Sequence, residues 1–165
     1  MTWKTAVSFV VFATLLTILT GWLIAVGGLP IQESLDFGDG EMRVIQTWLR
    51  LALPIGLILP GIAFFAGIKH PQLRQIFGFY FLVLLVQIFT ELIVVRVWIS
   101  SLVVLIGTIY TAFRVWQLWQ GLKLATKIPL HRFSDKLIRG LLWLLLLFWS
   151  SNLMMLLTVA WPSIV

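Results

Sequence analysis

Polar residues in this chain fall into short clusters that separate long apolar runs. The apolar runs cover residues 5–29, 44–68, 76–119 and 138–161. The hydrocarbon core of a bilayer is about 30 Å thick, and about 20 helical residues cross it. Three of the runs therefore have the length of one crossing, whereas the run 76–119 has the length of about two.

The positions of the basic residues decide how the run 76–119 folds. Lys and Arg gather at the N-terminus, at 69–74 and at 123–139, while the segment 31–41 is acidic. Basic segments of membrane proteins stay on the cytoplasmic side, and these three share a side only if the long run crosses twice. A single helix of that length would also be about 66 Å long. We therefore predict a tight hairpin that turns near 96–101, with spans 76–95 and 99–119.

These spans predict an all-α polytopic integral membrane protein. A single domain over residues 1–165 would form a bundle of five transmembrane helices, with the hairpin between the third and the fourth. We expect the N-terminus in the cytoplasm and the C-terminus on the opposite side of a bacterial inner membrane or a thylakoid-like membrane. A cleaved signal peptide is the competing interpretation of the first run, but its apolar core is longer than the usual 7–15 residues or so.

The overall composition supports the membrane class. The chain is 61% hydrophobic and 11% charged, whereas about 25% of the residues of a soluble domain are charged. The net charge of +6 does not indicate nucleic-acid binding, because most of the basic residues flank apolar runs. The chain has no cysteine, which excludes disulfides, thiolate metal sites and cysteine nucleophiles.

The second apolar run contains Pro54 and Pro60, together with three glycines. Proline removes a helix hydrogen bond and clashes with the preceding turn, so this helix should be kinked. A kinked, glycine-rich helix can line a transport pathway, but it also occurs in static bundles.

Polar side chains inside the apolar runs are the candidate functional residues, because charge in lipid is costly. They are Arg50, Gln87, Glu91, Arg96 and Asn152. Glu91 could pair with Arg50 on another helix or with Arg96 on its own. Such a pair would either fix helix packing or form a proton- or ion-responsive group at the mouth of a cavity. Gln87 and Asn152 are expected to hydrogen-bond between helices.

Other polar and aromatic positions are expected to serve helix packing. Gly107, Thr111 and Arg114 share one helix face by their spacing. They predict a close helix contact from which Arg114 reaches toward the inner head groups. Trp22 and Trp149 lie deeper than the interfacial tryptophans, so we expect both to pack between helices.

The basic segment 123–139 interleaves charged and apolar residues. This pattern is typical of a segment at the head-group level beside anionic lipid, although a simple cytoplasmic loop would have the same charge. The candidate anionic-lipid contacts are Lys123, Lys127, Arg132, Lys136 and Arg139.

No catalytic, cofactor or metal site is predicted. The chain lacks HExxH, Walker and GxSxG motifs, and its two histidines lie outside the apolar runs, where they cannot hold a haem within the helices. We expect a non-enzymatic accessory, assembly or scaffold subunit, with the bilayer and a membrane-protein partner or a second copy as its contacts. The alternatives are a small-solute or ion transporter that uses Arg50, Gln87 and Glu91, and a lipid- or quinone-binding protein with a groove near the kinked helix.

Overall fold

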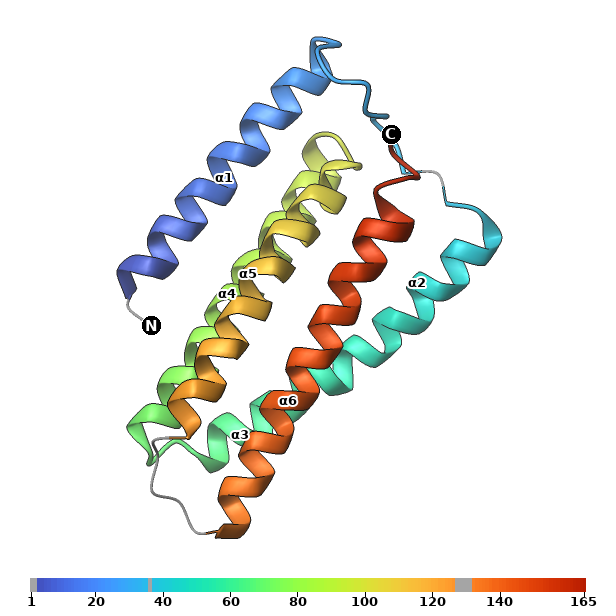
Figure 1. The fold of residues 1–165 in the computed structure, drawn as a ribbon. Helices are drawn as coiled ribbons and strands as arrows, with labels where there is room; N and C mark the ends of the chain where they lie inside the picture. The colour runs from blue at the N-terminus through green and yellow to red at the C-terminus, as the bar shows by residue number, and fades with distance from the viewer. Residues whose placement is uncertain (1–2, 36, 127–131) are drawn as a thin grey trace.

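The chain forms an up-and-down bundle of helices (Figure 1). The computed structural model describes residues 3–35, 37–126 and 132–165, with the backbone alone at 3, 95 and 132–135. The elements are α1 (Trp3–Ala25), α2 (Asp39–Leu51), the π-helix η1 (Ala52–Ile58), α3 (Leu59–Ala66), α4 (Pro71–Val97), α5 (Leu102–Ala125), α6 (Arg132–Met155) and the π-helix η2 (Leu156–Ala160). Within the described ranges, five helical stretches are long and apolar enough to cross a membrane, as the sequence predicted.

The long apolar run folds into the predicted hairpin. Residues 98–101 connect α4 to α5, and the two helices run antiparallel beside each other (Figure 1). The backbone N–H of Ser101 and the hydroxyl of Ser100 both donate to the carbonyl oxygen of Glu33, at 3.3 and 3.2 Å. The loop that follows α1 therefore holds this turn in place.

The first helix ends earlier than predicted, at Ala25. Gly27 has a φ of 72°, a left-handed conformation that glycine adopts without strain. Its N–H donates to the carbonyl of Ile24 at 2.9 Å, and the N–H of Gly28 donates to the carbonyl of Leu23 at 2.8 Å. This pair of bonds is a Schellman cap, which terminates the helix by satisfying its last carbonyls.

The second stretch begins at Asp39, five residues before the predicted start at 44. The carboxylate of Glu41 accepts a hydrogen bond from the N–H of Gly38 at 3.1 Å. Acids in a first turn also interact favourably with the helix dipole. The end of the acidic segment is thus helical. The basic segment also differs from a simple loop, because α5 continues to Ala125 and α6 already begins at Arg132.

The second stretch contains the predicted kink. A π-helical segment, Ala52–Ile58, surrounds Pro54, and the N–H of Leu59 donates to the carbonyl of Pro54. The wider π turn accommodates the residue that cannot donate its own N–H. As a result α2 leans away from the bundle (Figure 1), and none of its described residues is buried.

The core of the bundle lies among α4, α5 and α6, with α3 packed at one end. Its fully buried residues include Phe77, Leu118, Leu142 and Leu145. On the other side, α1 packs on α5 through Phe9, whose ring stacks on Phe113 with centroids 3.8 Å apart.

The outward faces of the helices carry many exposed apolar side chains. Phe65 is 72% exposed and Val97 is 78% exposed. Trp22, which was expected to pack between helices, is 57% exposed on α1. That expectation was wrong, because the depth of a residue along a helix does not specify the face on which it lies.

Candidate functional site

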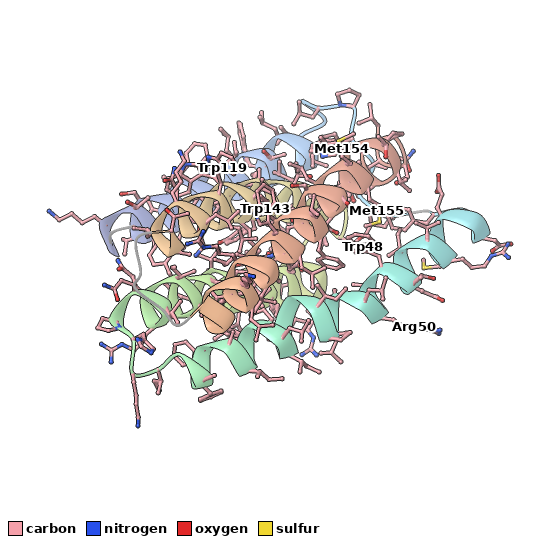
Figure 2. The ribbon with its side chains drawn as sticks, turned by 60° about the horizontal axis from the view of Figure 1, so that its bottom comes forward. Trp48, Arg50, Trp119, Trp143, Met154 and Met155 are labelled. Atoms are coloured by element: carbon pink, nitrogen blue, oxygen red, sulfur yellow. The ribbon has the colours of Figure 1, made fainter. Side chains whose placement is uncertain are left out.

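A cavity of about 490 Å³ lies between the kinked second stretch and the α4–α5–α6 core. It exists because α2 leans outward while Trp48 maintains contact with α6 by stacking on Phe148, with centroids 4.5 Å apart. Figure 2 shows Trp48 and Met155 in the space between α2 and α6. Its walls are mainly apolar and include Ile45, Leu49, Leu53, Leu57, Leu84, Ile88, Val103, Met155 and Leu156.

Two glycines enlarge this cavity. Gly56 in η1 and Gly107 in α5 both line it without a side chain. The nearest atoms to a Cβ at Gly107 would be the methyl groups of Leu156, at 3.6 Å, and a carboxylate oxygen of Glu91, at 3.9 Å. A larger residue at Gly107 would therefore be tolerated at its Cβ and would extend into the cavity.

Three polar side chains interrupt the apolar lining. Gln87 and Glu91 come from successive turns of α4, and Asn152 comes from α6. The Nδ2 group of Asn152 donates to the hydroxyl of Thr111 on α5 at 3.1 Å. The cavity thus has an apolar body with one hydrogen-bonding wall.

Behind this wall lies Arg114, which is 0% exposed. Its Nη2 donates to Oε1 of Gln87 at 2.6 Å, and Nε2 of Gln87 donates to Oε1 of Glu91 at 2.7 Å. The carboxamide therefore bridges the cation and the carboxylate. We call this set, Arg114–Gln87–Glu91, the polar triad.

The expectation that Arg114 extends to the head groups was wrong. The side chain points into the bundle, where Gln87 supplies an acceptor and two aromatic rings face the guanidinium. Its central carbon lies 4.1 Å from the ring centroid of Trp149 and 5.5 Å from that of Tyr80. Such cation–π contacts contribute about 2 kcal/mol or more when desolvated. They compensate part of the cost of removing the cation from water.

The two aromatic residues also connect the polar triad to the kink. Nε1 of Trp149 donates to the hydroxyl of Tyr80 at 2.9 Å, and that hydroxyl donates to the carbonyl of Gly56 at 2.6 Å. A Cβ at Gly56 would come within 3.0 Å of the Trp149 ring. Glycine thus allows η1 to approach α6 closely enough for this chain of hydrogen bonds to form. The central Trp149 packs between helices, as expected.

Not every polar atom of this region is satisfied. Within the described part of the chain, Nε and Nη1 of Arg114 and both side-chain polar atoms of Gln117 are buried without a hydrogen-bond partner. The polar groups that stabilise the buried cation of Arg114 are therefore the Gln87 bridge and the Glu91 carboxylate. Glu91 is also the only acid in the sequence between Glu41 and Asp135.

Neither arginine predicted as a partner of Glu91 reaches it. Arg50 and Arg96 are both exposed, and neither lines the cavity. Figure 2 shows Arg50 pointing away from the bundle, because α2 turns that face outward. Among the described residues, the side chain of Glu91 is hydrogen-bonded by Gln87. The sequence did contain a clue, since Gln87 and Glu91 share one face of α4 and Arg114 lies on the small-residue face of α5.

Lys123, Lys136 and Arg139 lie at the opposite end of the bundle from the acidic loop (Figure 1). Lys123 and Arg139 border a groove between α5 and α6. Lys136 is exposed on α6. Lys127 falls outside the described residues, and only the backbone of Arg132 is described.

Among the described residues, no three His, Cys, Asp or Glu side chains are grouped closely enough to hold a metal ion.

Comparison with known proteins adds no family to this geometry. The sequence matches no protein-family profile, no curated protein is similar to it, and no solved structure resembles its fold.

Proposed function

We propose that this chain is an integral membrane protein whose cavity binds one neutral amphiphile, such as a lipid or a quinone. The membrane setting is supported by the five apolar stretches and by the apolar side chains exposed on their outer faces. The proposed orientation follows the charges: the ends near Lys4, Lys69 and Lys123 are cytoplasmic, and the acidic loop and the C-terminus face the other side.

The observation that carries the proposal is an apolar cavity with one polar wall. Its volume of about 490 Å³ falls in the range of ligand pockets, about 300–1,000 Å³. An apolar lining suits a hydrocarbon or ring system, while Glu91 and Asn152 can orient a single polar end. On its outer side the cavity is covered only by α2 and η1, and α2 leans away from the bundle. A molecule dissolved in the bilayer therefore has a short path to this site.

The charges of the wall favour a neutral head group. Arg114 does not line the cavity, but it neutralises Glu91 through the Gln87 bridge. The wall therefore presents hydrogen-bonding groups with little net charge, and a strongly charged ligand would lose its hydration without finding a counter-ion. A head group with hydroxyl or carbonyl functions fits this environment.

The other two functions expected from the sequence receive less support. A transporter built on Arg50, Gln87 and Glu91 would need these three side chains around one pathway, and Arg50 points away from the cavity. A role as an accessory or scaffold subunit remains a prediction, because the exposed apolar faces suit lipid and protein partners equally.

A pair of glycine substitutions tests the binding proposal. Gly107→Leu would fill the cavity, whereas Gly140→Leu places the same side chain on α6 where a Cβ would meet no atom within 4 Å. Native mass spectrometry and lipidomics of protein extracted in polymer nanodiscs should detect one neutral amphiphile per wild-type and Gly140→Leu molecule. Gly107→Leu should lose it while remaining folded. Equal occupancy in both variants, or an empty wild-type protein, would refute the proposal.

A further inference from the structure

The cytoplasmic ends of α5 and α6 form a second candidate binding site, remote from the cavity. Trp119 and Lys123 lie one turn apart on α5, and Arg139 and Trp143 lie one turn apart on the antiparallel α6. All four line a groove of about 510 Å³, together with Leu122 and Thr126. Figure 2 shows the two tryptophans on these neighbouring helices.

The aromatic and cationic side chains of the groove are already arranged around one another. The rings of Trp119 and Trp143 meet edge to face, with centroids 6.4 Å apart, and Nζ of Lys123 lies 5.4 Å from the Trp119 ring. The two indoles remain 45% and 49% exposed, so their faces can still contact a ligand. The hydroxyl of Thr126 donates to the carbonyl of Lys123 at 2.8 Å. Arg139 already interacts with another residue, but its guanidinium carries five N–H donors and can bind a ligand as well.

We propose that this groove binds the phosphate of an anionic phospholipid. The phosphate would lie between Lys123 and Arg139, and the glycerol and first acyl carbons would lie against Trp119 and Trp143. Arginine binds phosphate oxygens with a bidentate fork, and lysine adds a compact charge. The cationic and the aromatic pairs are one helical turn apart, about 5.4 Å, which matches the step from a phosphate to the upper acyl chain.

Charge complementarity and position select this ligand. The segment 123–139 carries Lys123, Lys127, Arg132, Lys136 and Arg139 against one acid, Asp135. Tryptophan side chains prefer the boundary between head groups and hydrocarbon, and anionic lipids are enriched in the cytoplasmic leaflet beside such basic segments. The inference rests on the proposed membrane setting but not on the cavity, so each site can be tested without the other.

The test uses the full-length protein and two variants of equal charge. Lys123→Gln/Arg139→Gln removes the groove cations, and Lys69→Gln/Arg74→Gln removes two exposed cations from the same end of the bundle. Native mass spectrometry with phosphatidylglycerol and phosphatidylcholine gives the binding of each lipid. The groove variant should bind phosphatidylglycerol about tenfold more weakly, because it loses charge-assisted hydrogen bonds. The control variant and phosphatidylcholine binding should change by less than about threefold.

Three outcomes would overturn this proposal. An equal loss in the control variant would mean that binding reflects the overall charge. An equal affinity of the wild-type protein for both lipids would mean that no anionic head group is recognised. If inorganic phosphate displaced phosphatidylglycerol at millimolar concentration, the groove would be a site for free phosphate and not for a lipid. Trp119→Leu/Trp143→Leu adds a second check, because it should weaken lipid binding without a change in charge.

Discussion

The polar triad makes a prediction that depends on both of its charges. Glu91→Leu leaves the guanidinium of Arg114 fully buried without its one acidic neighbour among the described residues, and a guanidinium cannot release its proton in a protein. Arg114→Met leaves a carboxyl at the cavity wall, which can become neutral by taking up a proton. Glu91→Leu should therefore destabilise the protein more than Arg114→Met does.

The magnitudes follow from the typical cost of such changes at buried sites. Removing one partner of a buried charge pair costs about 3–5 kcal/mol, so Glu91→Leu should fall in that range and Arg114→Met below it. Gln87→Leu retains both charges but removes the hydrogen bonds of 2.6 and 2.7 Å. The bond to Arg114 joins two helices, and the bond to Glu91 lies within α4. At about 0.6–1.7 kcal/mol for each hydrogen bond inside a membrane, the loss of both should cost about 1–3 kcal/mol.

The double variant Glu91→Leu/Arg114→Met removes both charges together. It should be less destabilised than the sum of the single variants by about 2–3 kcal/mol, which is the coupling energy of a double-mutant cycle. The assay is reversible unfolding in mixed micelles of dodecylmaltoside and sodium dodecyl sulfate, followed by tryptophan fluorescence. The exposed Arg50 and Arg96 provide the controls, and each change to methionine should alter the stability by less than about 0.5 kcal/mol. Additivity of Glu91→Leu and Arg114→Met within about 0.5 kcal/mol would refute the reasoning.

Two further predictions concern the hydrogen bonds of Tyr80 and the topology of the chain in the membrane. Tyr80→Phe should lower the unfolding free energy by about 1–2 kcal/mol, because Tyr80 joins two hydrogen bonds. Tyr110→Phe should cost less, because the hydroxyl of Tyr110 makes no contact stronger than a marginal one with Thr90. Equal effects of the two changes in the same assay would contradict the bonding pattern. For the topology, single cysteines replace Asp39, Lys69 and Val165 in the cysteine-free chain. An impermeant thiol reagent added outside the cell should label positions 39 and 165 but not 69, and labelling of all three would rule out the proposed orientation.

The sequence predicted correctly those features that do not depend on how the helices pack. They follow from the chemistry of single residues or from the distribution of charge along the chain. Pro54 cannot donate a helix hydrogen bond in any environment, so the kink was predictable. The hairpin followed from the distribution of charge along the whole chain, and its turn at 98–101 lies within the predicted segment. The predicted bounds mostly lie within a few residues of the observed ones. The largest shifts are at the end of α5, which continues to Ala125 instead of 119, and at the start of α6, which begins at Arg132 instead of 138.

The contacts of the site were not predictable in the same way. In a helix that is apolar all round, the hydrophobic pattern does not reveal which face meets a neighbour. Arg50 was expected beside Glu91, but the outward lean of α2 separates the two residues. Arg114 was expected to extend to head groups, yet Gln87 and the rings of Tyr80 and Trp149 retain it in the core. These contacts come from three different helices, and only the tertiary structure brings them together.

Photo-crosslinking inside a membrane tests the central claim most directly. A neutral monoacylglycerol with a diazirine on its acyl chain would be added to vesicles that contain the full-length protein, and the labelled residues would be mapped by mass spectrometry. The account predicts saturable labelling of the cavity residues Ile88 and Met155, lost in Gly107→Leu and retained in Gly140→Leu. The outward-facing Leu15, 62% exposed on α1, should be labelled without saturation in every variant. Labelling of Ile88 and Met155 that never saturates, or that survives Gly107→Leu unchanged, would contradict the account.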